Sequence, residues 1–187
     1  MRIISGKYKG RKLKSSSSFE IRPTTDRVKE FIFNVLQDFA RDKIVADIFS
    51  GSGNLGLEAL SRGARKVIFV DNSAASIAVL KENIRHLQIP EEQYQIIRLD
   101  AITFASANPP GIDLFLLDPP FVYPPIQELL DVLFNSTAMS ASSLLVIEHE
   151  KNNPILEKSD HYRIIKQRTF GRSIISFLNQ RGTNETQ

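Results

Sequence analysis

The chain has 187 residues, of which 42% are hydrophobic and 24% charged, so it suits one globular domain and leaves no room for two independent cores. No apolar run reaches the about 18 residues that span a bilayer, and the N-terminus is charged where a signal peptide would be apolar, so we expect a cytoplasmic protein. The absence of cysteine excludes disulfides, thiol catalysis and iron–sulfur clusters, and three scattered histidines give no expectation of a metal site.

The basic charge is concentrated at the start of the chain. Residues 1–30 carry nine Lys or Arg side chains against three acids, whereas the remainder has a net charge of −3. Two glycine turns at Gly6 and Gly10 predict a basic N-terminal hairpin extension over residues 1–20, linked through serines 15–18. Such a cluster can bind RNA phosphates or can be an ordinary solvated surface. The candidate RNA-binding residues are Lys7, Lys9, Arg11, Arg22 and Arg27.

The main domain, residues 21–180, alternates between strand and helix patterns. It opens with an amphipathic helix, whose apolar residues recur at helical spacing from Val28 to Phe39. The predicted strands are 44–49, 66–71, 95–100, 112–118 and 144–149, the predicted helices between them are 55–61, 73–87 and 126–134, and the last two strands are 162–170 and 173–179. Nearly continuous apolar strands alternating with helices indicate an α/β, Rossmann-like fold: a mostly parallel sheet with helices on both faces and an antiparallel hairpin at its end. We expect residues 181–187 to form a disordered tail.

A glycine-rich loop follows the first predicted strand. Residues 47–56 read Asp-Ile-Phe-Ser-Gly-Ser-Gly-Asn-Leu-Gly, a G-x-G-x-x-G placed between a strand and a helix. Glycines at this position allow a tight turn and let a ligand approach backbone N–H groups at a helix N-terminus. Asp71 ends the second strand 20 residues after Gly51, where a carboxylate can accept hydrogen bonds from ribose hydroxyls. The loop therefore predicts a nucleoside-containing cofactor.

Four successive strands carry an aspartate at or near their C-terminal ends: Asp47, Asp71, Asp100 and Asp118. These ends share one edge of a parallel sheet, the edge at which open α/β sheets bind ligands. A single aspartate there is best explained as a helix cap or a turn residue, but four carboxylates attract a cation. They favour the sulfonium and ammonium groups of S-adenosylmethionine over a dinucleotide.

The chemically most specific feature is the sequence Asp118-Pro119-Pro120-Phe121. Two prolines stiffen the turn and remove two N–H donors, which leaves carbonyl acceptors beside a carboxylate. This arrangement suits an exocyclic base amine, whose hydrogens would be held while its lone pair points at an electrophilic methyl group. Phe121 could stack on the base. The competing interpretation is a strand-ending proline turn with Phe121 in the core.

Four segments together resemble the RsmD family of bacterial 16S rRNA guanine-N2 methyltransferases: residues 2–13, 22–34, 47–64 and 118–121. The resemblance runs from residue 2 to about residue 179. It implies a class I methyltransferase domain with a seven-stranded sheet and S-adenosylmethionine as methyl donor. It also implies methylation of one guanine N2 in a partly assembled small ribosomal subunit. The chain departs from the expected pattern at Phe170, where we expect tyrosine.

The resemblance also implies roles for individual residues. The expected cofactor-binding residues are Asp47, Ser50, Gly51, Gly53, Asp71, Asn72, Asp100 and Ala101. Among them Asp71 would bind the ribose, Asp100 and Ala101 the adenine, and Asp47 would face the methionine end. The expected catalytic residues, Asp118 to Phe121, would hold the guanine.

Three other functions stay open at this stage. The acceptor could be adenine N6 or cytosine N4, because the acid-Pro-Pro turn serves any exocyclic amine. The glycine loop alone would also fit an NAD-dependent oxidoreductase, although the chain has no room for a substrate domain. A ribosome-assembly module without catalysis is the third. For the methyltransferase we expect 16S rRNA within the small ribosomal subunit as partner and a monomeric protein.

Overall fold

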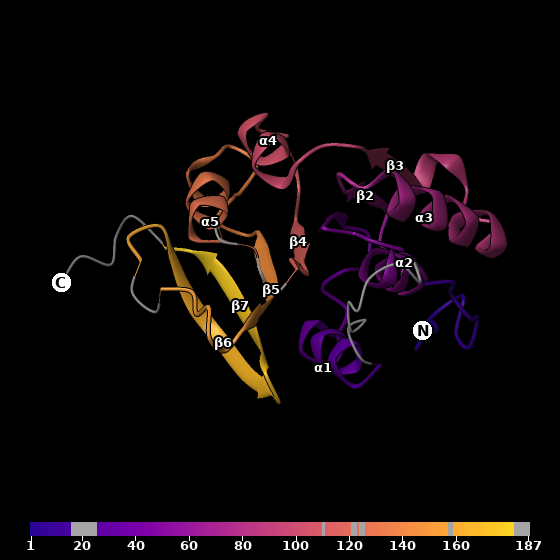
Figure 1. Cartoon of the computed structure of the whole chain (residues 1–187), viewed down its shortest axis with the longest axis horizontal. Helices are drawn as coiled ribbons and strands as arrows, with labels where there is room; N and C mark the ends of the chain where they lie inside the picture. Colours follow the sequence, from indigo (N-terminus) through magenta and orange to yellow (C-terminus); the bar gives the residue numbers. More distant parts are fainter. Residues whose placement is uncertain (16–25, 110, 121–122, 124–125, 157–158, 182–187) are drawn as a thin grey trace.

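The computed structural model describes residues 1–15, 26–109, 111–120, 123, 126–156 and 159–181. They form one sheet with the strand order β3-β2-β1-β4-β5-β7-β6 (Figure 1). The strands are β1 (Ile44–Ile48), β2 (Lys66–Val70), β3 (Tyr94–Ile97), β4 (Leu114–Leu117), β5 (Leu144–Glu150), β6 (Tyr162–Phe170) and β7 (Ser173–Gln180). The first five strands pair in parallel, and β7 pairs antiparallel with both β5 and β6. The predicted α/β fold with a mostly parallel, seven-stranded sheet is confirmed.

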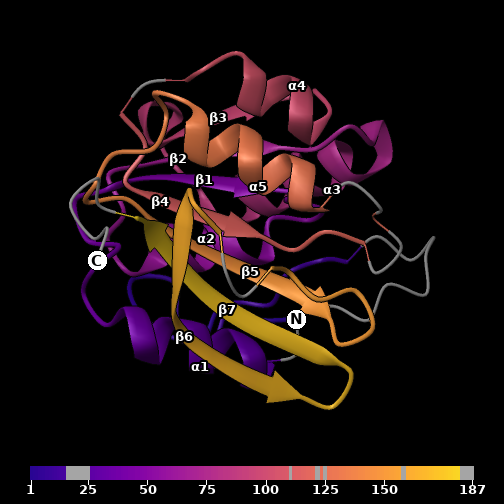
Figure 2. The same ribbon diagram turned by 90° about the vertical axis from the view of Figure 1, so that its left-hand side faces the viewer.

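Helices cover both faces of this sheet. They are α1 (Asp26–Leu36), α2 (Asn54–Ser61), α3 (Ala74–Leu87), α4 (Ala101–Ser106) and α5 (Ile126–Asn135), with a short 3₁₀ turn at Glu91–Gln93. Neighbouring strand residues point to opposite faces: Val45 packs into a cluster with α1, α2 and α3, whereas Ala46 packs into a cluster with α4 and α5. Figure 2 shows α4 and α5 on one side of the strands and α1 on the other. The central strands are therefore buried from both sides, which explains their continuous apolar sequence.

Three predicted boundaries were wrong by a few residues. Helix α1 ends at Leu36 and does not continue to Phe39, because Gln37 adopts a left-handed conformation with φ 48°. Strand β3 ends at Ile97, short of residue 100, because a six-residue helix that the sequence analysis missed begins at Ala101. Strand β4 covers only Leu114–Leu117 of the predicted residues 112–118.

The N-terminal segment, residues 1–15, folds back on itself in antiparallel fashion and packs against α2 and α3. The backbones of Ile3 and Arg11 are hydrogen-bonded at 2.9 Å, although the pairing amounts to an isolated bridge and not to two strands. Gly6 has φ +83°, and a Cβ atom there would lie 1.8 Å from the backbone oxygen of Ser61 at the end of α2. Only glycine permits this approach, and Ile3 is 1% exposed, so the segment shares the core of the main domain.

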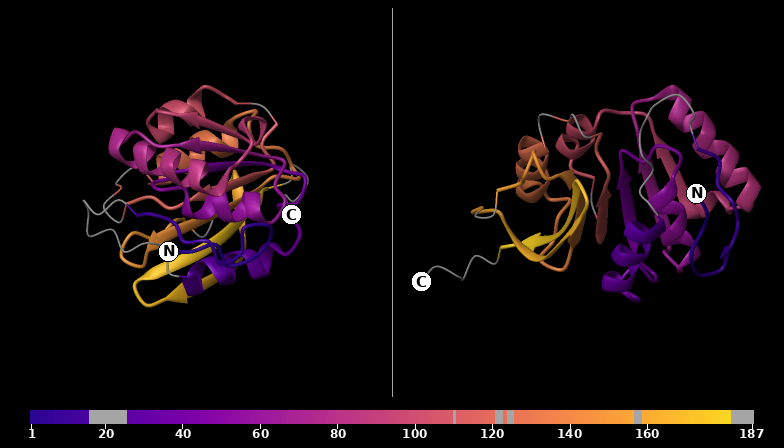
Figure 3. Two further views of the ribbon diagram at one scale, coloured as in Figure 1. Left: turned by 90° about the vertical axis from the view of Figure 1, so that its right-hand side faces the viewer. Right: turned by 60° about the horizontal axis from the view of Figure 1, so that its bottom comes forward.

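Figure 3 shows the N-terminal segment and the β6–β7 hairpin at opposite ends of the molecule. The predicted serine link falls mostly outside the described residues, as does the predicted tail after Arg181. Among the helices of the described ranges, none is both long and apolar enough to cross a membrane.

A buried ion pair fixes the N-terminal segment to the glycine-loop helix. Glu58 of α2 is fully buried and accepts hydrogen bonds from the backbone N–H groups of Ile4 (2.7 Å) and Ser5 (3.0 Å). Lys29 of α1, equally buried, has its Nζ 3.6 Å from Glu58 and donates to Asn54 Oδ1 at 2.7 Å. Burial lowers the pKa of Lys29, and the nearby Glu58 carboxylate opposes that shift. Nothing in the sequence pattern predicted this pair.

Candidate functional site

The candidate site lies where the strand order reverses, between β1 and β4. Their register pairs Ile48 with Leu117, and the N–H of Asp118 reaches the carbonyl of Ile48 at 3.4 Å. The loop after β1 therefore lies beside the corner that begins at Asp118. This is the position at which open α/β sheets bind ligands, and the structure brings the two predicted motifs together there. We call the carboxyl ends of β1 to β4 the reaction edge.

The three glycines of the loop have different roles. A Cβ atom on Gly51 would meet nothing closer than 4.0 Å, so open space lies over this residue, whose φ is +54°. A Cβ on Gly53 would lie 2.5 Å from the Leu80 side chain, and one on Gly56 would lie 2.4 Å from the Phe69 ring. Gly53 and Gly56 are thus required for packing of α2, whereas Gly51 leaves room for a ligand.

Asp71 holds the glycine loop from the end of β2. Its two carboxylate oxygens accept backbone N–H groups from Gly51 and from Ser73, each at 2.8 Å. Because every carboxylate oxygen has a second lone pair, Asp71 keeps acceptor capacity for a ligand hydroxyl. The adjacent Asn72 is exposed, and its carbonyl accepts a hydrogen bond from Arg98.

Asp47 lies beneath the loop, within β1, and is 1% exposed. Its Oδ2 accepts the N–H of Gly56 at 2.8 Å. Burial raises its pKa to about 8, the charges of Asp118 and Asp71 add to the shift, and the Gly56 hydrogen bond opposes it. A pKa of about 8 favours the protonated form of Asp47 at pH 7. Of the four carboxylates predicted at this edge, Asp47 therefore does not contribute a full negative charge.

Asp100 has a structural role as the N-cap of helix α4. It is exposed, caps the N-terminus of α4 and accepts the N–H of Ile102 at 2.9 Å, while Ala101 is buried in the first turn of that helix. Asp100 still belongs to the reaction edge, because its charge raises the pKa of Tyr123.

Two aromatic residues that the sequence analysis missed line this edge. The ring of Tyr123 packs edge-on against Phe49, with centroids 4.9 Å apart. Phe49 has φ +63°, an uncommon backbone conformation for a bulky side chain, directly before the glycine loop. Burial raises the pKa of Tyr123 to about 12, with Asp100 and Glu128 as further causes. The only sequence signal was the position of Tyr123 just beyond the Asp-Pro-Pro turn.

Two hydroxyls at the edge are buried without a hydrogen-bond partner within the described part of the chain: Ser50 Oγ in the glycine loop and the phenol oxygen of Tyr123. Buried polar atoms are normally hydrogen-bonded, since an unmade bond costs about 1–3 kcal/mol. Both atoms fit a ligand that brings its own polar groups. In the neighbouring corner Asp118 is half-buried, Pro119 is buried and Pro120 is exposed, whereas Phe121 lies outside the described residues.

The predicted RNA-binding residues that the structure describes lie on two elements, the N-terminal segment and helix α1. Lys7, Lys9 and Arg11 are exposed on the N-terminal segment. Arg27 is exposed on α1, where its guanidinium lies 6.0 Å from the ring centroid of Phe170. Arg22 lies outside the described residues.

The strand order, the glycine loop after β1 and the acid after β2 define a class I methyltransferase fold. Comparison with known proteins agrees. The chain is 35% identical to ribosomal RNA small subunit methyltransferase D of Haemophilus influenzae over 95% of this chain and 91% of the relative. The solved structure of the candidate methyltransferase yhhF from Escherichia coli superposes with a TM-score of 0.86 at 28% identity, covering 96% of this chain and 97% of that one.

A second solved structure, the candidate methylase HI0767 of Haemophilus influenzae, gives a TM-score of 0.82 at 31% identity, covering 97% of this chain and 98% of the other. Residues 1–179 match the family described as "Conserved hypothetical protein 95". The chain therefore belongs to this family, the RsmD family of small-subunit rRNA methyltransferases.

Proposed function

We propose that the protein transfers a methyl group from S-adenosylmethionine to the exocyclic N2 of one guanine in 16S rRNA of the small ribosomal subunit. The observation that carries this proposal is the adjacency of the glycine loop and the Asp118 corner at the β1/β4 switch point. One element is suited to a nucleoside, and the other to an aromatic amine. Family membership supports the same activity.

The residues of the reaction edge fit S-adenosylmethionine, which supplies an electrophilic methyl group on a sulfonium centre. Gly51 leaves open space, and Ser50 Oγ is a buried donor without a partner. Asp71 would accept the ribose hydroxyls with its remaining lone pairs. The cofactor-binding roles of Gly53 and Asp47 are indirect in this proposal: Gly53 shapes the loop, and Asp47 holds it through Gly56. Asn72, Asp100 and Ala101 remain candidates for the nucleoside end.

In the corner, Asp118 and the carbonyls beside Pro119 and Pro120 would accept the two hydrogens of the guanine amine. This orientation turns the nitrogen lone pair towards the methyl group, and the Asp118 charge stabilises the positive charge that develops on N2. As the new N–C bond forms, the bond between the methyl carbon and the sulfonium sulfur would break, and S-adenosylhomocysteine would leave as a neutral thioether. The reaction does not need a general base with a raised pKa, because the amine becomes acidic only after the N–C bond has formed. Asp118 then accepts the released proton. We propose that Phe121 stacks on the guanine after it is flipped out of its helix.

The RNA partner is proposed from two observations. The Haemophilus influenzae relative and an Escherichia coli relative of 30% identity are both named ribosomal RNA small subunit methyltransferase D. Three exposed basic residues of the N-terminal segment, Lys7, Lys9 and Arg11, can neutralise phosphates. We propose a partly assembled small subunit in the cytoplasm as the substrate and a monomeric enzyme.

The test is to incubate the protein with labelled S-adenosylmethionine and unmodified small subunits, then digest the RNA and identify the methylated nucleoside. We expect N2-methylguanosine at a single position. N6-methyladenosine or N4-methylcytidine would replace the proposed acceptor with the rival one, because the Asp118 corner serves any exocyclic amine. Absence of label in any nucleoside, with S-adenosylmethionine shown to bind by calorimetry, would favour a binding module without catalysis.

A further inference from the structure

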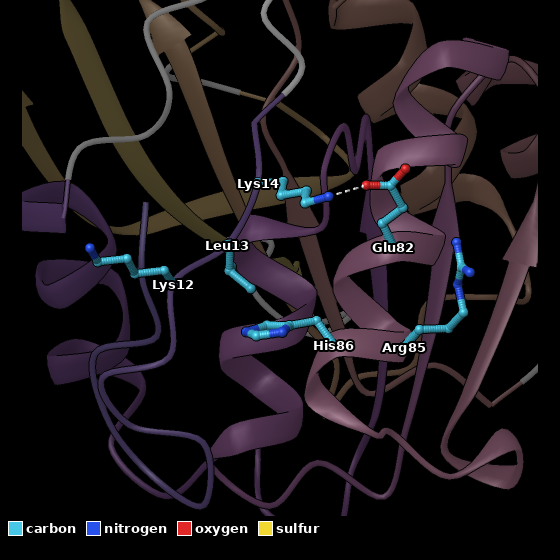
Figure 4. Close-up of a pocket in the computed structure, with 6 residues that line it drawn as sticks. All are labelled: Lys12, Leu13, Lys14, Glu82, Arg85 and His86. Atoms are coloured by element: carbon cyan, nitrogen blue, oxygen red, sulfur yellow. Dashed lines mark hydrogen bonds and ion pairs between the residues drawn. The ribbon is translucent and has the colours of Figure 1, made fainter.

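A basic pocket of about 590 Å³ lies between the N-terminal segment and α3, apart from the reaction edge. Its lining residues are Lys12, Leu13, Lys14, Glu82, Arg85 and His86. Figure 4 shows the two lysines on the N-terminal segment opposite α3, which contributes the other charged side chains. The two walls are 68 residues apart in sequence at Lys14 and Glu82, so the basic N-terminal sequence alone could not predict that a pocket forms against α3. We call it the α3 pocket.

Hydrogen bonds hold the two walls together. Asn83 of α3 is 1% exposed, and its side chain accepts the N–H of Lys14 at 2.8 Å and donates to the Lys14 carbonyl at 3.0 Å. Arg11 donates to the backbone carbonyl of His86 at 2.9 Å. Leu13, which lies between the lysines, is 6% exposed and packs into the core. The pocket is therefore pre-organised, because the backbone that carries its lysines is fixed to the helix opposite.

The lining carries excess positive charge. Glu82 is its single acid and pairs with Lys14 at 2.7 Å, and this contact lowers the pKa of Glu82, so the carboxylate stays ionised. Among the described residues, neither Lys12 nor Arg85 forms an ion pair within 4 Å, although the charge of Arg85 also helps to lower the pKa of Glu82. The lining has three cationic side chains against one carboxylate, so a net positive charge remains, and the imidazole of His86 can donate a further N–H. Figure 4 shows Lys12 and Arg85 extending to opposite sides of the pocket, so the positive charge is spread across its rim and matches an extended anion.

The position of the pocket indicates a polymeric anion. Asn83 also donates to the carbonyl of Ser52 at 2.9 Å, so the same side chain touches both the pocket wall and the glycine loop. In the other direction the N-terminal segment continues the positive charge with exposed Lys7 and Lys9. Several cations distributed along one exposed segment fit consecutive phosphates better than they fit one small ion.

We propose that the α3 pocket binds the sugar–phosphate backbone of the rRNA substrate, at nucleotides other than the one that is methylated. This inference rests on the proposed function and adds a binding site to it. Because the pocket is separate from the Asp118 corner, it contributes to the affinity for RNA and not to the chemical step. Its loss raises KM for the subunit and leaves kcat at saturation unchanged.

The test is the double variant Lys12→Gln/Arg85→Gln, which removes two charges and keeps Leu13 and Asn83. Binding to unmodified small subunits is measured from 50 to 200 mM monovalent salt at constant magnesium. Because each lost phosphate contact reduces the salt slope by about 0.7–0.9, we expect the slope to fall by about 1.4–1.8. The affinity lost over this fourfold salt range then shrinks by about sevenfold to twelvefold.

The matched control is Arg65→Gln/Lys166→Gln, which likewise removes one Arg and one Lys charge from exposed positions, the first just before β2 at the opposite edge of the sheet and the second on β6. It should keep the wild-type slope, and thermal melts should show that both double variants are folded. An unchanged slope in the pocket variant, or an equal fall in the control, overturns the proposed pocket. If the wild type forms N2-methylguanosine while the pocket variant binds normally, the proposed role of the α3 pocket is refuted and the proposed function stands. If the wild type forms no methylated nucleoside, the proposed function fails, whatever the slopes are.

Discussion

Asp47→Asn tests whether the carboxyl under the glycine loop carries a proton in the folded protein. Asp47 is 1% exposed and its pKa is raised from 3.8 to about 8, chiefly by burial. Between these two values the folded chain keeps a proton that the unfolded chain has lost. Its contribution to stability is therefore complete below pH 3.8, declines as pH rises, and is absent above about pH 8.

The size of the change in unfolding free energy follows from the difference between the two pKa values of Asp47. One pKa unit corresponds to about 1.4 kcal/mol, so a shift of about four units changes the free energy of unfolding by on the order of 5 kcal/mol across the window. Asparagine has no proton to lose, and its side-chain oxygen can still accept the Gly56 N–H. The variant should therefore gain stability relative to wild type by about 1.4 kcal/mol per pH unit between pH 5 and pH 7.

The assay is urea unfolding of both proteins at pH 5, 6, 7 and 8, with the difference in unfolding free energy plotted against pH. All other titrating groups are common to both proteins, so they cancel in this difference. Asp38→Asn serves as control, because it removes a carboxylate whose side chain is 86% exposed. If the difference for Asp47→Asn does not change with pH, Asp47 is ionised in the folded state and the reasoning is refuted.

Three other predictions concern the same region. Glu58→Gln should lower the free energy of unfolding by about 3–5 kcal/mol in urea denaturation, because it leaves Lys29 buried without its partner carboxylate. In calorimetry, Gly51→Ala should weaken S-adenosylmethionine binding at least tenfold, with only the small loss of stability that alanine at φ +54° causes. Gly56→Ala should lower the melting temperature much further, because its Cβ would meet the packed core; an equal loss of stability in the two variants would contradict the division of roles. Asp118→Asn should bind the cofactor like wild type but turn over at least a hundredfold more slowly, and full activity would exclude its proposed role.

Much of the fold could be predicted from local patterns. Apolar strands alternating with helices indicated the parallel sheet. The glycine loop, Asp71 and Asp118 predicted the edge of that sheet at which we propose that the ligands bind. Helix α4 escaped prediction because six residues are too few to display a helical period. Its cap, Asp100, was therefore assigned to a strand end.

The remaining features depend on residues that are distant in sequence. The protonation of Asp47 follows from burial between the sheet and α2, and the pairing of Phe49 with Tyr123 follows from the adjacency of β1 and β4. The α3 pocket exists because Asn83 fixes Lys14 to the helix. Sequence by itself determined most of the helices and strands and suggested where a nucleoside would bind, because the helix and strand patterns and the glycine loop depend on near neighbours. Only the tertiary structure decided the charge state of Asp47, the lack of hydrogen-bond partners for the Ser50 and Tyr123 hydroxyls within the described residues, and the position of the α3 pocket. Burial and proximity arise only when distant segments pack together.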